Sequence, residues 1–245
     1  MIIYLKEKND IEGFVKAGAI AGKILKELVE NIKIGTTTKE INEVAFQKCK
    51  ENNGEPTFLN YKGFPFSICA SKNKTMVHGF PDSLPLQPDD ILSIDFGFTL
   101  NGYIGDVATT IAFKDNCLIS SCKLALDLAI KNCYAGQKLN DIGKIVEDTA
   151  TKNKFLVPLN YGGHGIDKNK LHSAPFIPNF YNFKNDITLY PGMVLAVEPM
   201  FIESKSNNTK ILSDGWSVVA EGNTSHFEHT ILITDGEPVV LTKGE

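Results

Sequence analysis

Helical spacing of apolar residues predicts two helices near the start of the chain. Between residues 9 and 31, Ile, Leu, Val and Phe recur every three or four positions, as on one face of a helix. Gly35 ends that region. Residues 37–40, Thr-Thr-Lys-Glu, then fit a capping box, in which a Thr and a Glu side chain satisfy free backbone N–H groups at a helix start. A second helix is therefore predicted through Cys49.

A similar arrangement recurs further along the chain. Apolar residues between Leu124 and Cys133 predict a third helix, Gly136 follows it, and Asp141-Ile142 opens a fourth. Gly136 lies 101 positions after Gly35, and each Gly precedes its helix by the same distance. The match indicates two duplicated halves, about residues 9–115 and 116–245, each a helix pair followed by strands.

Apolar runs bounded by Gly, Asn and Pro predict the strands. They lie at residues 91–113, 193–201, 216–220 and 226–234, whereas residues 157–190 and 204–215 are predicted to be loops. Within the first run, Asn101-Gly102 is the strongest short-range signal for a hairpin with a type I′ turn. No linker divides the chain. The pattern predicts one domain over residues 1–245, an α+β sandwich whose curved antiparallel sheet is covered by two helix pairs.

Composition and charge narrow the function classes. The 245 residues are 42% hydrophobic, enough for a large core, and the net charge of −4 gives no argument for binding nucleic acid or an anionic membrane. Five Cys without a C-x-x-C pair indicate reduced thiols rather than a disulfide framework. No segment has the length of a signal-peptide core or a membrane span. A cytoplasmic monomer is expected.

The first candidate for chemistry is a pair of carboxylates in the hairpin. With Asn101-Gly102 as the turn, Asp95 faces Ala108, and Asp106 lies two residues from Ala108 on the same face. The two Asp residues are then diagonal neighbours, roughly 7–8 Å apart. A solvated face would explain the pair without any ligand. Apolar neighbours favour burial instead, and Gly97 permits close approach of a ligand or backbone. A buried pair needs a cation or a shared proton.

Three further residues fit the same interpretation. Glu198 and Glu228 each sit in an apolar strand, VLAVEP and HFEHTILI, and His164 lies between glycines that leave room for a metal. Each alone is also compatible with an edge strand facing water or a surface turn. Together with Asp95 and Asp106 they supply four carboxylates and one imidazole. That set suits a pair of divalent ions with oxygen-rich coordination.

An ordered set of motifs gives a more specific prediction. The segments are YKGFPFSICAS, MVHGFP, ILSIDFG, GYIGDVATT, GGHGI, PGMVLAVEPM, DGW and FEHTILIT. In their order and spacing the chain resembles the type I methionine aminopeptidases of peptidase family M24. The resemblance implies a pseudo-two-fold pita-bread fold. It also implies an enzyme that removes the N-terminal Met from nascent proteins when the second residue is small.

The resemblance also implies roles for individual residues. The five metal ligands would be Asp95, Asp106, His164, Glu198 and Glu228. Asp106 and Glu228 would bridge two divalent ions, Co, Mn, Fe or Zn, that activate water. Glu198 would also shuttle a proton. His78 would contact the substrate backbone near the scissile amide, and His172 would steady the tetrahedral intermediate.

The resemblance further implies the sites that surround the metals. The substrate pocket would be lined by Tyr61, Phe64, Cys69, His78 and Trp216. A monovalent cation would bind near Asn73, Thr75 and Thr224. Partners would be peptides and nascent chains that begin with Met, and the ribosome is implied by resemblance alone.

This chain departs from the family pattern at a few positions. Asp167 stands where relatives usually have Gly, Ser173 where they have Glu, and Phe64 where they often have Tyr. His172 follows His164 by eight residues instead of seven. We expect the inserted residue to displace His172.

Two other functions stay open at this point. A proline-directed aminopeptidase or prolidase has the same fold, but usually carries a large extra N-terminal domain for which 245 residues leave no room. A non-catalytic paralogue could keep the fold and bind peptide or protein, with its metal ligands replaced. All five candidate ligands are present here, which favours an enzyme.

Overall fold

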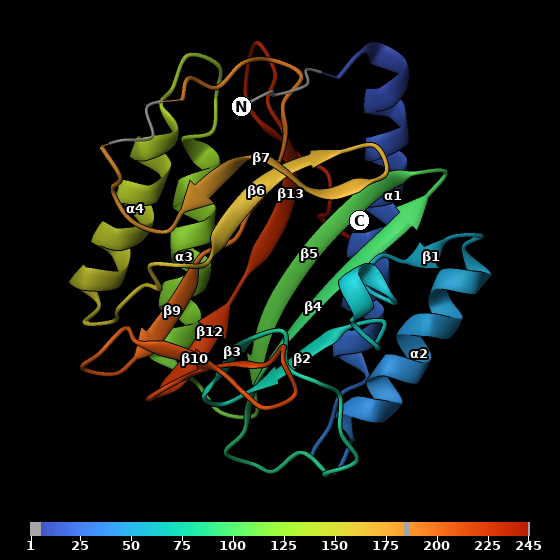
Figure 1. Ribbon diagram of the computed structural model, residues 1–245, viewed down its shortest axis with the longest axis vertical. Coiled ribbons are helices and arrows are strands. Elements are labelled where there is room, and N and C mark those ends of the chain that lie inside the picture. The colour runs from blue at the N-terminus through green and yellow to red at the C-terminus, as the bar shows by residue number, and fades with distance from the viewer. Residues whose placement is uncertain (1–5, 184–186, 245) are drawn as a thin grey trace.

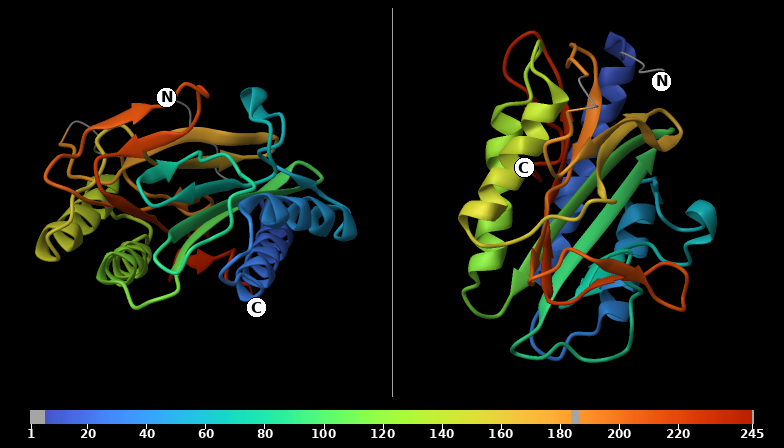
Figure 2. Two further views of the ribbon diagram at one scale, coloured as in Figure 1. Left: turned by 90° about the horizontal axis from the view of Figure 1, so that it is seen from below. Right: turned by 60° about the vertical axis from the view of Figure 1, so that its left-hand side comes forward.

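The computed structural model describes residues 6–183 and 187–244, which form a curved sheet with helices on one face. Residues 1–5, 184–186 and 245, which belong to the predicted domain and in part to a predicted loop, lie outside the described residues. Two pairs of helices pack on the same face of the sheet (Figures 1 and 2). Their bounds are α1 Lys8–Glu30, α2 Thr38–Glu51, α3 Cys117–Lys131 and α4 Leu139–Lys152.

The main sheet is antiparallel and has nine strands among the described residues, in the order β1-β4-β5-β13-β8-β6-β7, with β2 beside β4 and β14 beside β13. Its strands are β1 Glu55–Pro56, β2 Cys69–Lys72, β4 Ile91–Leu100, β5 Tyr103–Ala112, β6 Gly162–Asp167, β7 Lys170–Pro178, β8 Val194–Val197, β13 Glu228–Leu232 and β14 Val239–Val240. Smaller sheets join β10 Thr209–Ile211, β11 Val218–Ala220 and β3 Thr75–Val77, and pair β9 Met200–Glu203 with β12 Asn223–His226. The short helix η1 spans Tyr61–Gly63.

The predicted helices and the central hairpin are confirmed. Thr37 and Glu40 form the capping box at the start of α2, where the Glu40 side chain accepts a hydrogen bond of 2.7 Å from the Thr37 N–H. Asn101 and Gly102 have φ values of 53° and 83°, which a type I′ turn requires. The register of β4 and β5 continues without a bulge from this turn and places Asp95 opposite Ala108.

Two predicted loops are wrong. Residues 157–190 contain β6 and β7, and residues 204–215 contain β10. β6 begins Gly-Gly-His-Gly, and glycine is depleted in strands, so the sequence pattern did not indicate one. The predicted strands at 193–201 and 226–234 are each interrupted. The first breaks at Glu198-Pro199 and the second at Phe227, so both breaks lie beside candidate ligands.

The turn between the two helices of each pair makes a matching hydrogen bond to a loop residue outside the strands. Gly35 N–H donates to the Leu86 carbonyl and Gly136 N–H donates to the Leu189 carbonyl, both at 2.9 Å. The φ values of these glycines, +92° and +91°, are ones that other residues rarely adopt. The arrangement agrees with two similar halves. Their duplication, and the single domain over the whole chain, stay predictions.

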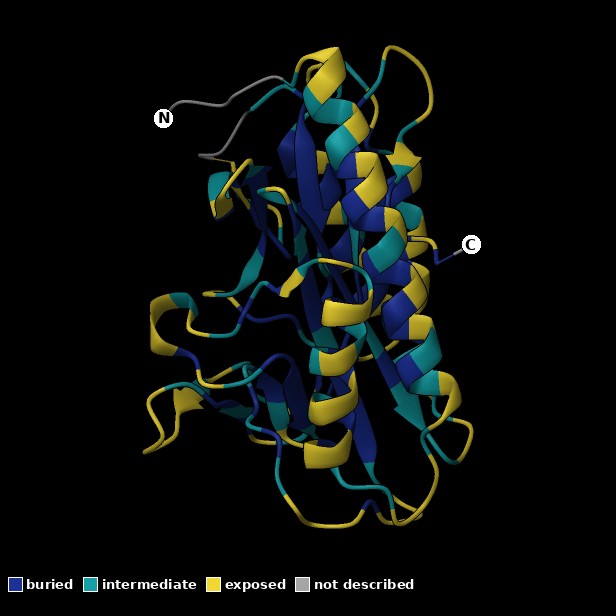
Figure 3. Ribbon diagram, turned by 90° about the vertical axis from the view of Figure 1, so that its right-hand side faces the viewer, coloured by how far each residue is buried: buried dark blue, intermediate teal, exposed yellow. Residues whose placement is uncertain are grey.

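The core lies between the helices and the sheet. One buried cluster joins α1 and α2 to β4 and β5, and another joins α3 and α4 to β8 and β13. Figure 3 shows that the outer faces of the helices are exposed while the sheet beneath them is buried. A third cluster includes Phe58, Phe64 and Cys69, together with Phe14 of α1. Among the described helices, none combines the length and apolar character that a membrane span needs.

Candidate metal centre

The register of three neighbouring strands brings the carboxylates together. Asp95 on β4 and Glu228 on β13 both pair with Ala108 on β5, so they flank it on one face of the sheet. Asp106 lies two residues before Ala108 and therefore points to the same face. The diagonal relationship of Asp95 and Asp106, predicted from the hairpin, is confirmed by this register.

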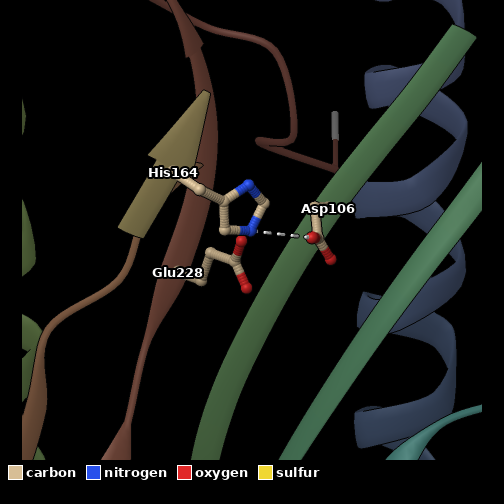
Figure 4. Close-up of side chains that lie close together, drawn as sticks. All are labelled: Asp106, His164 and Glu228. Carbon is tan, nitrogen blue, oxygen red and sulfur yellow. Dashed lines mark ion pairs between the residues drawn. The ribbon is translucent and has the colours of Figure 1, made fainter. Parts of the chain in front are cut away.

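His164 and Glu198 reach the same place from the other half of the sheet. His164 on β6 pairs with Ala196 on β8, and Glu198 follows Ala196 by two residues. His164 Nε2 lies 3.5 Å from Glu198 Oε1 and 3.7 Å from Asp106 Oδ2. Figure 4 shows the side chains of Asp106, His164 and Glu228 converging from three strands. The structure thus brings all five predicted ligands to one site.

The glycines around His164 are required by the neighbouring strands. A Cβ atom on Gly163 would lie 2.2 Å from the Ala196 carbonyl oxygen of β8, and one on Gly165 would lie 2.0 Å from the Ala174 carbonyl oxygen of β7. Either distance is impossible for a real side chain. The glycines therefore let β6 fit between its two neighbours. We expected them to leave room for a metal, and close packing of the backbone is the reason that the structure gives.

The charges at this site are buried. Asp106 and Glu228 are only 3% and 2% exposed. Burial raises the pKa of all four carboxyl groups, and their mutual repulsion raises it further. Burial lowers the pKa of His164 to about 4, which makes its imidazole neutral. Its Nδ1 lies 3.1 Å from the Gly165 carbonyl oxygen, an arrangement in which Nδ1 carries the proton and Nε2 is free for a ligand.

Unsatisfied buried oxygens test whether a cation fits. Asp95 Oδ1, Asp106 Oδ1 and Glu228 Oε1 have no hydrogen-bond partner among the described residues. Leaving such groups buried without a partner costs several kcal/mol in general, and a charged group costs more than a neutral one. Asp106, His164 and Glu228 offer three ligand atoms within 4.8 Å of one another. The site therefore fits divalent cations.

The five predicted ligands line a cavity of about 420 Å³. Every residue predicted to be catalytic or to bind substrate also lines it: Tyr61, Phe64, Cys69, His78, His172 and Trp216. The predicted monovalent-cation residues are not part of this lining within the described chain. They meet elsewhere, where the Thr224 hydroxyl lies 2.9 Å from the Asn73 carbonyl oxygen and 2.8 Å from that of Thr75.

Aromatic rings form one wall of the cavity. Phe64 is buried, and its ring stands edge-to-face against Trp216 at 5.1 Å between centroids. His78 packs against Trp216 and Tyr161 at 6.1 and 6.3 Å. Its φ of 58° is unusual for a residue other than Gly and marks a strained backbone of the kind found at functional sites. Burial lowers the pKa of His78.

His172 is not displaced, and our expectation was wrong. The pairing of β6 with β7 shifts register between His164 and Asp167, and an irregularity of this kind can accommodate an extra residue. His172 lines the cavity, its ring centroid lies 4.4 Å from that of His164, and its Nδ1 lies 2.9 Å from the Tyr61 hydroxyl. Burial, together with the charges of nearby His and Lys residues, lowers the pKa of His172 to about 3.

Asp167 has a structural partner. Its carboxylate pairs with the Lys6 ammonium, and both side chains are largely buried. The Lys6 N–H also donates to the Gly192 carbonyl oxygen at 2.8 Å. The segment before α1 is thereby tied to the end of β6, the strand that carries His164. The departure from Gly at this position thus coincides with a cross-link between two distant segments.

Two residues of the site were missed by sequence analysis. His226 lies 3.4 Å from Glu198, and Thr230 binds the backbone of Asp106. Both stand two positions from Glu228, one on either side. Because side chains alternate along a strand, both residues are expected on the same face of the sheet as Glu228. His226 lines the same cavity as Glu228, although the strand breaks at Phe227 between them. The sequence did not indicate that break.

Comparisons with known proteins identify the family. The family model of metallopeptidase family M24 matches residues 12–235. The chain belongs to metallopeptidase family M24. Members of this family use divalent metal, in agreement with the ligand groups described above. A methionine aminopeptidase from Clostridium perfringens is 38% identical over 98% of this chain and 99% of its own.

Solved structures of M24 proteins share the fold. A methionine aminopeptidase from Thermotoga maritima superimposes with a TM-score of 0.94 and 32% identity, over 99% of this chain and 100% of its own. The predicted pita-bread fold and the resemblance to methionine aminopeptidases are thus confirmed. A prolidase from Pyrococcus furiosus has a TM-score of 0.77 at 21% identity, and this chain covers 66% of it. That likeness extends to the fold alone.

Proposed function

We propose that this chain is a dinuclear-metal aminopeptidase that removes the N-terminal Met when the second residue is small. The convergence of five ligands with unsatisfied buried oxygens in an apolar cavity carries the proposal. Full-length similarity to proteins named methionine aminopeptidase supports the same activity and reaction class.

The ligand geometry supports two ions. Asp106, His164 and Glu228 form one group of potential ligands, and Glu198, His226 and Glu228 form another, so Glu228 belongs to both. Asp106 and Glu228 are proposed to bridge, and Asp95 to complete the set. When bound, divalent ions polarise the scissile carbonyl and lower the pKa of a water molecule to about 7. Co, Mn, Fe and Zn all suit these ligands.

Glu198 is proposed to move the proton. Its carboxylate lines the cavity and lies within 3.5 Å of His164 on one side and 3.4 Å of His226 on the other. A carboxylate held in this way can accept a proton from the attacking water and deliver it to the leaving amine.

Two neutral imidazoles are proposed to hold the reacting peptide. Burial lowers the pKa of both His78 and His172, so each ring carries one N–H and one free nitrogen at neutral pH. The contact between Tyr61 and His172 Nδ1 fixes the orientation of the His172 ring. His172 can then donate to the oxygen on which charge develops, and His78 can contact the substrate backbone.

The cavity wall formed by Tyr61, Phe64, Cys69 and Trp216 is proposed to hold the Met side chain. A thioether makes favourable contacts with aromatic rings, worth about 0.3–1.5 kcal/mol each. Leu is shorter and branched and loses these contacts. A hydrophobic pocket discriminates near-isosteres by about 1–3 kcal/mol, so selectivity is large but not absolute. A small second residue is required where the substrate passes His78.

We propose a cytoplasmic monomer that acts on nascent chains at the ribosome, with a monovalent cation near Asn73, Thr75 and Thr224. The five Cys are free in the structure, which supports a reducing compartment. The net charge of −4 gives no support for a nucleic-acid partner.

Peptide cleavage tests the proposal. The metal-loaded protein is offered Met-Ala-Ser, Leu-Ala-Ser, Met-Lys-Ser and Ala-Pro-Ala, and the released amino acid is quantified. We expect efficient cleavage of Met-Ala-Ser, slower cleavage of Leu-Ala-Ser and near resistance of Met-Lys-Ser. Efficient cleavage of Ala-Pro-Ala with Met-Ala-Ser slow would favour the proline-directed alternative. Binding of these peptides without cleavage of any would favour the non-catalytic one.

A further inference from the structure

His226 occupies an unusual position for a buried imidazole. The residue is 1% exposed, and neither ring nitrogen makes a hydrogen bond to a described residue. Buried polar groups without a partner are rare, and each one calls for an explanation such as an ion. His226 lines the same cavity as the five predicted ligands. Its Nε2 lies 3.4 Å from Glu198 Oε2, on the other side of that carboxylate from His164.

The geometry of His226 is that of a ligand. Glu198, His226 and Glu228 each offer one atom, and the three atoms lie within 4.8 Å of one another. Atoms bound to one ion at about 2.1 Å are themselves roughly 3–4 Å apart, so a small adjustment closes this group around an ion. Glu198, His226 and Glu228 thus form a second group of potential ligands. It shares Glu228 with the group of Asp106, His164 and Glu228.

The backbone of His226 is held in place. The Thr110 hydroxyl accepts from the His226 N–H at 2.9 Å and donates to the His226 carbonyl oxygen at 2.7 Å. Thr110 is itself bonded to the Ser93 hydroxyl at 2.8 Å. β12 pairs His226 with Met200, which also lines the cavity. Preorganisation of this kind is what a metal ligand requires.

We propose that His226 is a sixth protein ligand of the centre and binds, through Nε2, the ion that Glu198 and Glu228 also hold. The inference rests on the proposed dinuclear site and adds a second imidazole to it. Imidazole favours Zn, Fe and Co over the hard cations that carboxylates alone would suit. The second imidazole therefore favours binding of Zn, Fe and Co at this centre.

Counting bound imidazoles tests the inference directly. In the Co²⁺-loaded protein, each coordinated His gives one exchangeable, strongly shifted N–H signal in the proton NMR spectrum. We expect two such signals, from His164 and His226, and one signal in His226→Gln. His229→Gln is the matched control, because His229 is a partly buried His that bonds to Thr242 and does not line the cavity. It should keep both signals.

Metal affinity gives a second readout. Calorimetric titration should show at least about tenfold weaker Co²⁺ and Zn²⁺ binding by His226→Gln, with a smaller loss for Mn²⁺. If that variant does not fold, His78→Gln, His172→Gln and His229→Gln decide by elimination, since the chain has five His. All three should retain two signals.

The outcomes separate the two proposals. A single shifted N–H signal in the wild-type protein, or two in His226→Gln, overturns the inference while leaving the dinuclear site intact. Failure of the wild-type protein to bind any divalent ion overturns both.

Discussion

The Thr230 hydroxyl forms hydrogen bonds with both polar groups of the Asp106 backbone. The Thr230 hydroxyl accepts from the Asp106 N–H at 2.8 Å and donates to the Asp106 carbonyl oxygen at 2.7 Å. One hydroxyl on β13 thus takes the place of the ordinary ladder of backbone hydrogen bonds at the point where β5 presents Asp106, a proposed metal ligand. Both residues are buried, so water cannot substitute for these bonds.

Replacement of Thr230 should therefore weaken metal binding. Thr230→Val keeps the shape but removes the hydroxyl, leaving two backbone groups unsatisfied at a cost of about 1–3 kcal/mol each. We expect a lower melting temperature and at least about tenfold weaker Co²⁺ affinity by calorimetry. Thr230→Ser keeps the hydroxyl and should retain near wild-type affinity. Equal losses in the two variants would contradict a role for the hydroxyl.

Glu228 should show opposite effects on stability and activity. Burial and the charges of Asp106, Glu198 and Asp95 raise the pKa of Glu228. Its ionisation therefore costs stability in the metal-free protein, and this cost grows as the pH rises above the ordinary range of a carboxyl group. Glu228→Gln should melt higher than wild type at pH 8 without metal, by about 2–4 °C for each kcal/mol of repulsion removed. At pH 4 the difference should shrink.

The same substitution should abolish turnover with metal present, since it removes a charge proposed to be shared by two ions. Glu221→Gln, at an exposed position, is the control and should change neither property. A lower melting temperature for Glu228→Gln than for wild type, in the metal-free protein at pH 8, would contradict mutual repulsion of the buried carboxylates.

His172 should matter for catalysis, because the structure keeps it at the cavity in spite of the inserted residue. We expect His172→Ala to reduce kcat/KM for Met-Ala-Ser on the order of 10²-fold, the usual effect of removing one donor to a developing oxyanion. Tyr61→Phe removes only the contact that orients the ring and should cost less. Steady-state kinetics of wild type and both variants, each loaded with the same amount of metal, test this prediction. Unchanged kcat/KM in His172→Ala would restore the idea of a displaced residue.

The pair of Lys6 and Asp167 should contribute to stability rather than to chemistry. Removing one partner of a buried ion pair typically costs about 3–5 kcal/mol. Asp167→Asn should therefore lower the melting temperature markedly while leaving kcat/KM within about twofold, since Asp167 does not line the cavity among the described residues. Asp148→Asn breaks an exposed pair with Lys144 and should cost less than about 1 kcal/mol. Similar melting temperatures for the two variants would count against this role.

The central hairpin could be predicted from sequence because its information is local. Asn101-Gly102 determines the turn, and a regular two-residue period then places Asp95 and Asp106. β6 could not be predicted in this way. Its glycines serve contacts with β7 and β8, which lie elsewhere in the sequence. Its strand character comes from tertiary packing rather than from local propensity.

The walls of the site were reached by family resemblance, not by physical reasoning from the residues. The contact between Tyr61 and His172 joins positions 111 residues apart, and no period or turn signal connects them. The position of His172 could not be predicted because β6 and β7 pair irregularly. A register shift between strands can accommodate an inserted residue without moving a side chain out of the site. Alternation along the predicted strand at residues 226–234 places His226 on the face of Glu228, but it does not distinguish a potential ligand from any other residue on that face.

Removal and return of metal test the central claim most directly. The protein is stripped with a chelator, verified metal-free by elemental analysis, and titrated with Co²⁺ or Mn²⁺ while Met-Ala-Ser cleavage is followed. The account predicts no turnover without metal and recovery as the buried carboxylates fill with up to two ions per chain. Full turnover by the verified metal-free protein would contradict it.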